Sequence, residues 1–124
     1  MPTLRPTESV VAASQAAFYV TTGVWPLLHR RSFEWVTGPK ADFWLAQTVG
    51  VVVAAIGAGL GRSVVTRRPV SPDLRLAAGL SAAALALVDV YFVAQRRISP
   101  IYLLDAAAEV ALVAGWYAAG RSTD

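Results

Sequence analysis

Three carboxylates lie inside long apolar segments of this chain, and they are the residues best suited to carry chemistry. They are Asp89, Asp105 and Glu109. Asp105 and Glu109 are four positions apart, which places both on one face of a helix. A charged side chain at the centre of a membrane costs about 2.5–3.5 kcal/mol on insertion scales, so such groups need partners, protons or water. Because burial disfavours the charged form of a carboxylate, we expect Glu109 to be the group that takes up a proton.

Other polar residues recur at steps of three and four in the neighbouring apolar segments. Gln15, Tyr19 and His29 follow this rhythm in the first segment, and Gln47 follows it in the second. Helical residues with this spacing line one face, so we expect the polar stripes to face each other inside a bundle. The sequence therefore predicts a polar pocket in one half of the membrane, open to that side. In the other half of the membrane the bundle is expected to be mostly Ala, Val, Leu and Gly. The predicted ligand- or proton-binding residues are Glu109, Asp105, Asp89, Tyr19, Gln47 and His29.

Two main interpretations of these carboxylates remain open. In the first they bind a ligand, an ion or a proton, as intramembrane ionisable groups commonly do. In the second they only hold helices together, paired with His29, Arg96 or tyrosine hydroxyls, in a structural or assembly subunit. A membrane enzyme acting on a lipid-like or quinone-like substrate is a third interpretation. The spacing of serine, histidine and aspartate indicates no catalytic set, and we predict no cofactor and no metal site.

Four apolar segments are long enough to cross a bilayer. They cover residues 9–28, 43–61, 76–94 and 101–120. About 20 apolar residues in a helix span the hydrocarbon core of about 30 Å, and a spanning segment must satisfy its own backbone. The sequence therefore predicts an all-α polytopic membrane protein, an antiparallel bundle of four transmembrane helices in a single membrane domain, residues 1–124. A soluble four-helix bundle is disfavoured, because the second segment has only Gln47 and Thr48 as polar side chains and no wet face.

Composition and charge agree with a membrane protein. The chain of 124 residues is 56% hydrophobic and 15% charged, whereas soluble domains carry about 25% charged residues. The lipid bilayer is therefore the expected partner. The net charge of +3 comes from short clusters of basic residues between apolar segments. No basic face with interleaved aromatic residues is present, so we predict no nucleic-acid binding.

Small residues follow one face of the second segment. Gly50, Ala54, Gly57 and Gly61 recur at steps of four and three. Small faces let helix backbones approach closely. We expect this face to contact another helix, either in the same chain or across a homo-oligomer.

The basic residues give little information about orientation. Four spans place both termini on one side, and that side would carry Arg5, Arg62, Arg67, Arg68, Arg75 and Arg121. The opposite side would carry Arg30, Arg31, Lys40, Arg96 and Arg97. The positive-inside rule then compares six basic residues with five. We expect cytoplasmic termini in a bacterial inner membrane, since the arginine and alanine content is typical of a high-GC bacterial source.

The first loop, HRRSFEWVTGPKADFW, is the most distinctive stretch. Its tryptophans are typical of an aromatic belt at the membrane surface, and an amphipathic lid over the pocket is the alternative.

Together SFEWVTGPKADFWLAQTVG and RISPIYLLDAAAEVAL resemble a group of small uncharacterised bacterial membrane proteins with four predicted spans, over most of the chain. The resemblance implies topology and no activity. A looser likeness is to DoxX-type four-helix membrane proteins. Small multidrug exporters share the size, but their membrane carboxylate lies in the first helix, where residues 9–28 have none.

Overall fold

The described residues fold into five helices and contain no strand. The computed structural model describes residues 4–40 and 42–121, and the remaining residues of the predicted 1–124 domain lie outside the described part. The helices are α1 (Pro6–Leu28), α2 (Arg30–Thr37), α3 (Phe43–Thr66), α4 (Pro72–Ala94) and α5 (Tyr102–Arg121). The prediction of an all-α fold is confirmed for these residues. The short helix α2 is additional to the four expected helices.

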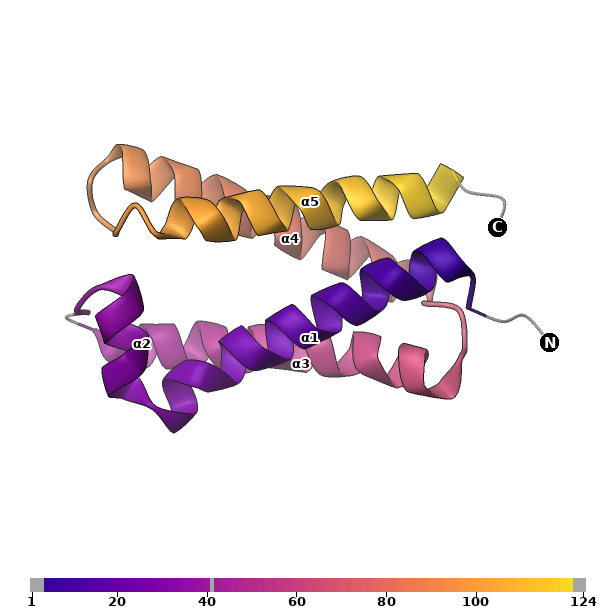
Figure 1. Ribbon diagram of the computed structural model, residues 1–124, viewed down its shortest axis with the longest axis horizontal. Helices are drawn as coiled ribbons and strands as arrows, with labels where there is room; N and C mark the ends of the chain where they lie inside the picture. Colours follow the sequence, from indigo (N-terminus) through magenta and orange to yellow (C-terminus); the bar gives the residue numbers. More distant parts are fainter. Residues whose placement is uncertain (1–3, 41, 122–124) are drawn as a thin grey trace.

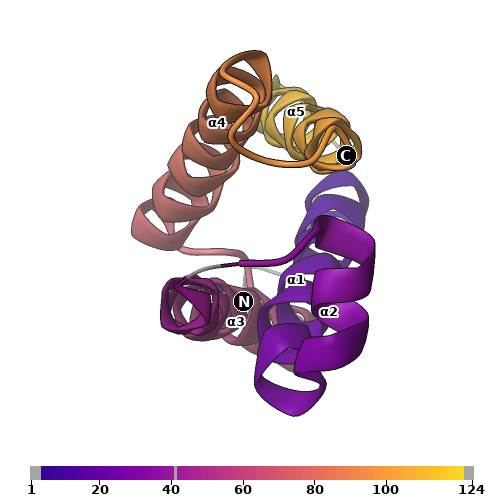
Figure 2. The ribbon, with the colours of Figure 1, turned by 90° about the vertical axis from the view of Figure 1, so that its left-hand side faces the viewer.

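The four long helices form two antiparallel pairs. α1 packs along α3, and α4 packs along α5, while α1 also contacts α5 and so joins the two pairs. α3 and α4 follow each other in the chain but touch only slightly. Figure 2, seen from the end that carries α2, shows the α1 and α3 pair apart from the α4 and α5 pair. α1 is therefore the central helix of the molecule, with one neighbour in each pair.

The small-residue face of α3 lies against α1. A Cβ atom added at Gly50 would collide with the carbonyl oxygen of Gly23, and one added at Gly57 would lie 2.9 Å from Cγ2 of Val20. Both glycines are buried. The absence of side chains at these positions allows the two backbones to approach closely. The expected helix contact therefore occurs within this chain, and α1 occupies the face that a homo-oligomer would have used.

The first helix begins earlier than expected. Pro6 is at its first turn, where the missing N–H of proline is tolerated, and Glu8 lies inside the helix with 3% of its surface exposed. The prediction that the first helix contains no carboxylate is therefore wrong. At the other end the backbone leaves the helix at His29, which has a φ of −149° and caps α2 by accepting a hydrogen bond from the Ser32 amide.

Local signals set the other helix ends. α3 ends at Thr66 and is capped by Arg67, which is left-handed with a φ of 56°. The side chain of Ser71 caps α4 by accepting from the Leu74 amide, and Pro72 follows it. α5 begins at Tyr102, one residue after the predicted start of the fourth segment.

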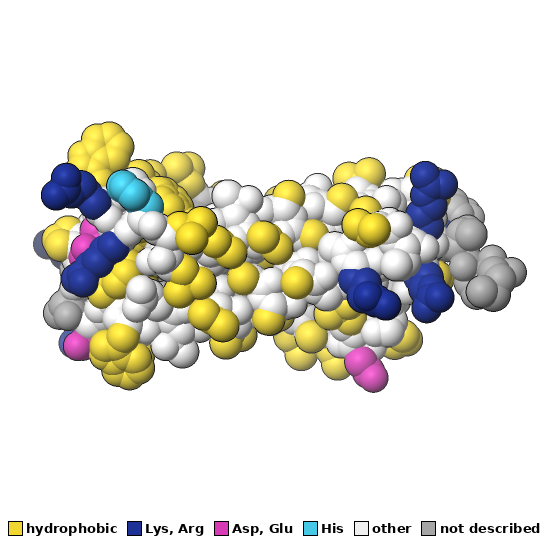
Figure 3. All heavy atoms as spheres, turned by 90° about the horizontal axis from the view of Figure 1, so that it is seen from below, with side chains coloured by type: hydrophobic (Ala, Val, Ile, Leu, Met, Phe, Trp, Pro, Cys, Tyr) yellow, Lys and Arg dark blue, Asp and Glu magenta, His cyan; other side chains and the backbone are white. Residues whose placement is uncertain are grey.

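Three helices are long and apolar enough to cross a membrane. They are α3, α4 and α5. Their outward side chains are mostly apolar, for example Val52, Leu87 and Val110, each more than half exposed. On the face drawn in Figure 3 the charged side chains gather at the two ends of the molecule, and the middle is apolar or uncharged. This arrangement is consistent with a membrane protein.

The helix α1 is not among the three, although residues 9–28 were expected to form the first span. Gln15, Tyr19 and Thr22 lower its hydropathy, and the first two of these are completely buried. Gln15 and Tyr19 therefore face the neighbouring helices.

Candidate functional site

The buried centre of the site is a hydrogen bond between α1 and α5. The hydroxyl of Tyr19 donates to Oε2 of Glu109 at 2.7 Å. Tyr19 has no exposed surface and Glu109 has 1%, so water does not compete for this bond. Both residues lie on the faces that the helical spacing predicts to point inward. A carboxylate that accepts a single hydroxyl still has most of its lone pairs to satisfy.

A second pair of carboxyl groups adjoins Glu109. Asp89 of α4 is buried, and its carboxyl group lies within hydrogen-bonding reach of that of Asp105 on α5. Two ionised carboxylates have no hydrogen to donate. Among the described residues no donor reaches Oδ2 of Asp89, although this atom is buried. A proton on one of the two carboxyl groups would make it a donor to the other.

Asp89, Asp105 and Glu109 therefore form one carboxylate cluster, in which each interacts electrostatically with the others. Within residues 4–40 and 42–121 no lysine, arginine or histidine forms an ion pair with any of them. The expected pairing with His29 or Arg96 is absent there, and only the expected pairing with a tyrosine hydroxyl is present. The cluster is thus three acidic groups without a described cationic partner.

Two residues expected at the site lie outside the cluster. His29 is exposed, and its Nδ1 is 2.7 Å from Oγ of Ser32 in the first turn of α2. The helical spacing that predicted an inward position for His29 does not apply to it, because α1 ends at Leu28. Gln47 is half-buried on α3, and no hydrogen bond in the described part of the chain joins it to the carboxylates.

Described residues of the loop after α2 contact the start of α5 and the connection between α4 and α5. Nζ of Lys40 lies 5.2 Å from the ring centre of Tyr102 and 5.7 Å from that of Phe33. A Cβ atom added at Gly38 would lie 3.8 Å from Cβ of Ser99, in the connection between α4 and α5. The loop and the α4–α5 connection are therefore in contact, as a lid over this end would require.

The carboxylate of Glu34 stabilises this loop. It accepts 2.8 Å hydrogen bonds from the backbone amide of Lys40 and from Nε of Arg30. These two donors favour the charged form and hold the pKa of Glu34 below its ordinary value.

The opposite half of the bundle is also polar, contrary to the expectation of a mostly apolar half. Nε1 of Trp116 donates to Oε1 of Gln15 at 2.6 Å, and Nε2 of Gln15 donates to the Ala78 carbonyl at 3.1 Å. Gln15 is fully buried and lies one helical turn from Tyr19 on α1. Buried polar residues therefore continue from the carboxylate cluster toward the end of the molecule that carries the termini.

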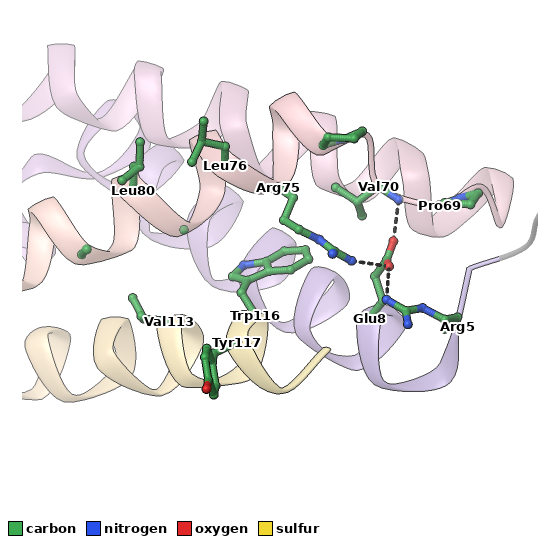
Figure 4. A pocket seen from close by; sticks show the side chains of 13 residues that line it. Arg5, Glu8, Pro69, Val70, Arg75, Leu76, Leu80, Val113, Trp116 and Tyr117 are labelled. Carbon is green, nitrogen blue, oxygen red and sulfur yellow. Dashed lines mark hydrogen bonds and ion pairs between the residues drawn. The ribbon is translucent and has the colours of Figure 1, made fainter. Parts of the chain in front are cut away.

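At that end lies a further buried acidic residue, Glu8, that the sequence did not indicate as functional. Glu8 accepts from the Val70 amide and from Arg75, both at 2.6 Å, and pairs with Arg5 at 3.4 Å (Figure 4). The guanidinium of Arg75 also lies 5.7 Å from the ring centre of Trp116. The missed signal is that Glu8 precedes Gln15 by seven positions, which continues the polar face of α1 by two turns.

The donor set does not have the form of a metal centre. In the part of the chain that the structure describes, no three histidine, cysteine, aspartate or glutamate side chains are arranged to hold a metal ion.

The comparisons with known proteins add no family. No family model matches this chain, and no curated protein or solved structure is significantly similar to it.

Proposed function

We propose that this chain is a multi-pass protein of a bacterial inner membrane in which α1 is a fourth span beside α3, α4 and α5. The buried polar face of α1 supports this, because Gln15 and Tyr19 have partners inside the bundle and its 23 residues are comparable to the 24, 23 and 20 residues of α3, α4 and α5. A central helix with lipid on little of its surface needs less hydropathy than an outer one. Four spans put both termini on one side, which we propose is the cytoplasm.

We propose further that the carboxylate cluster binds a proton. The observation that carries this proposal is the burial of Asp89 and Glu109 beside Asp105 without a described cationic partner. Like charges in close contact cannot all ionise at low cost, so one carboxyl group keeps its proton. Such a proton would be shared between Asp89 and Asp105, while the Tyr19 hydroxyl supports the charge on Glu109.

The proposed site exchanges its proton with one side of the membrane only. Asp89 and Asp105 are near the α4–α5 connection, and Gly38 of the loop after α2 contacts Ser99 in this connection. On the other side the polar contacts pass through Gln15 and Trp116. An amide and an indole N–H do not pass on protons at ordinary pH, since neither gains nor loses one readily. One-sided proton binding suits a component of proton-linked transport or a pH-sensitive ligand-binding subunit.

A structural role is the second candidate, and the Tyr19–Glu109 hydrogen bond favours it. This bond joins α1 to α5 and so contributes to holding the two helix pairs together. Interhelical hydrogen bonds in membranes contribute about 0.6 kcal/mol on average. In this role the cluster would stabilise the bundle without exchanging protons.

The substitution Glu109→Gln separates the two roles. The amide oxygen of glutamine still accepts from Tyr19, so we expect the free energy of unfolding to change by about 1 kcal/mol or less. The purified protein in lipid should release fewer protons than the wild type after a jump from acidic to alkaline pH. Asp42→Asn is the matched control, because Asp42 is exposed and its side chain makes no cap hydrogen bond.

Unchanged proton release in the Glu109→Gln protein, with release also unchanged in Asp42→Asn, would contradict the participation of Glu109 in proton binding by the cluster. A loss of stability of about 3–5 kcal/mol would indicate instead that Glu109 neutralises a buried cation.

A further inference from the structure

We propose that the groove between α4 and α5, at the end that carries the termini, binds an anionic phospholipid of the surrounding bilayer. One acyl chain would lie between the two helices, and the negatively charged headgroup would lie against Arg75 and Arg5. This inference rests on the placement of the chain in a membrane and is independent of the proton-binding role, because the groove shares no residue with the carboxylate cluster.

The walls of the groove are apolar. The groove has a volume of about 910 Å³ and is lined by Leu76, Gly79, Leu80 and Ala83 of α4 and by Val113 of α5. Figure 4 shows the Trp116 side chain between the two helices, with Leu76 and Leu80 farther along the groove. Ligand sites have volumes of about 300–1,000 Å³, so one acyl chain and its headgroup fit this space.

The polar end of the groove carries two guanidinium groups. Arg5 and Arg75 both pair with Glu8 there, and Arg5 also donates to the Ala119 carbonyl at 2.9 Å. Glu8 is already saturated by the Val70 amide and by Arg75. The Arg75 side chain is 30% exposed and lines the groove. A phosphate oxygen is an acceptor of the right charge for the accessible part of its guanidinium.

The two ends of the groove lie at the depths that a lipid would require. Arg75 is in the first turn of α4 and Trp116 is near the end of α5, so both are close to the membrane surface. Ala83 is eight residues farther along α4, roughly 12 Å deeper at ~1.5 Å per residue. Basic pockets between membrane helices near the surface bind anionic headgroups. A soluble anion would have no use for the apolar walls, and a second protein chain would have to insert its own carboxylate at this depth.

Native mass spectrometry of the complete protein tests the proposal. The protein is equilibrated with phosphatidylglycerol or with phosphatidylcholine of the same acyl chains, and the lipid retained on release from detergent is counted. We expect one tightly held phosphatidylglycerol and a preference over phosphatidylcholine of about fivefold, the effect of one basic residue near an anionic lipid.

The substitution Gly79→Phe fills the groove without disturbing the interior. No atom lies within 4 Å of a Cβ atom added at Gly79, so the new ring can extend into the groove. We expect this variant to melt at the wild-type temperature and to lose the held lipid. Ala77→Phe is the control, because Ala77 is exposed on α4 and does not line the groove, and it should keep the lipid. Gly79→Leu provides a smaller filling side chain if the phenylalanine lowers the melting temperature.

Three results would overturn the proposal. The first is equal retention of the two lipids by the wild type. The second is wild-type retention by both folded Gly79 variants. The third is a wild-type mass of two chains that bind no lipid, which would identify a second copy as the occupant.

Discussion

At the scale of single residues, some buried polar side chains have all the hydrogen-bond partners they need and others do not. Gln15 has a donor and an acceptor at 2.6 and 3.1 Å, and Glu8 has two donors at 2.6 Å. Asp89 has a buried oxygen that no described donor reaches. A buried polar atom without a partner costs about 1–3 kcal/mol and more for a charged group. The cost is avoided if the Asp89–Asp105 pair holds a proton, which is why we locate the function there.

The acidic residue of α2 gives a pH dependence that can be measured. The pKa of Glu34 lies below its ordinary value because the Lys40 amide and Arg30 favour the carboxylate. A lowered pKa in the folded state means that the contribution to stability is present above the ordinary glutamate pKa of about 4.3 and is lost as the pH falls through the folded value. We expect the NMR shift of the Lys40 amide to titrate with a midpoint below the ordinary value. In Glu34→Gln the amide should not titrate in this range, and a midpoint above 4.3 would contradict the hydrogen-bonded geometry.

The carboxylate cluster shows how far periodicity alone predicts a site. Tyr19 and Glu109 lie on regular helices at similar depth, so the spacing of residues was sufficient to predict that they face each other. His29 was expected on the same stripe but lies beyond the end of α1, where the spacing no longer applies. Whether Arg96 or a proton balances the aspartates depends on side-chain reach after the helix ends, and residue spacing contains no information about that.

At the scale of helices, the close approach of α1 and α3 depends on glycine. The two helices are joined by the α2 segment and pack along most of their length. A Cβ atom at Gly57 would lie 2.9 Å from Cγ2 of Val20 and 3.0 Å from Cβ of Tyr19. Tyr19 would have to move with its neighbour, so the packing of α3 also determines the position of the hydroxyl that binds Glu109.

We therefore expect Gly57→Ala to destabilise the fold. Overpacking of this kind costs about 1–3 kcal/mol, which exceeds the gain of about 1 kcal/mol in helix propensity. Thermal melting in detergent measures the change. Gly59→Ala is the control, because its Cβ would meet only Leu74 at an ordinary distance of 3.6 Å, and this variant should be as stable as the wild type or more stable. Equal melting temperatures for the two variants would show that the α1–α3 contact does not depend on Gly57.

The positions of the long helices could be predicted from the sequence, but the helix in the first loop could not. Apolar length and flanking proline placed the four long helices to within a few residues at most ends. α2 has only eight residues, and its ends are set by His29 binding Ser32 and by Glu34 binding the Lys40 amide. Glu8 was missed for a related reason, since a charged residue at a helix start is normally read as solvated.

At the scale of the molecule, the two helix pairs and the central α1 define an axis along which the charges are distributed. α2 and the α4–α5 connection lie at one end, and the first turn of α1 and the last turn of α5 lie at the other (Figure 1). Basic residues are present at both ends, and the three candidate spans lie between them. This axis would be the membrane normal.

Labelling of single cysteines tests whether α1 is the fourth span. The chain has no cysteine, so each introduced thiol is the only target. In intact vesicles we expect a membrane-impermeant reagent to label Leu4→Cys and Arg68→Cys from one side, and Arg31→Cys and Arg97→Cys from the other. Labelling of Leu4→Cys and Arg31→Cys from the same side would mean that α1 does not cross the membrane and that three spans remain.

The central claim is that the Asp89–Asp105–Glu109 cluster holds a proton, and infrared spectroscopy of the protein in lipid tests it most directly. A protonated carboxyl group has a C=O stretching band separate from those of carboxylates and of the backbone. We predict this band in the wild type at neutral pH, with the small shift in deuterated water that an exchangeable proton gives. It should persist in Asp42→Asn and disappear in Asp89→Asn, where Asp105 loses the neighbour with which it shares the proton. A wild-type spectrum without the band at neutral pH, or a band unchanged in Asp89→Asn, would contradict the account.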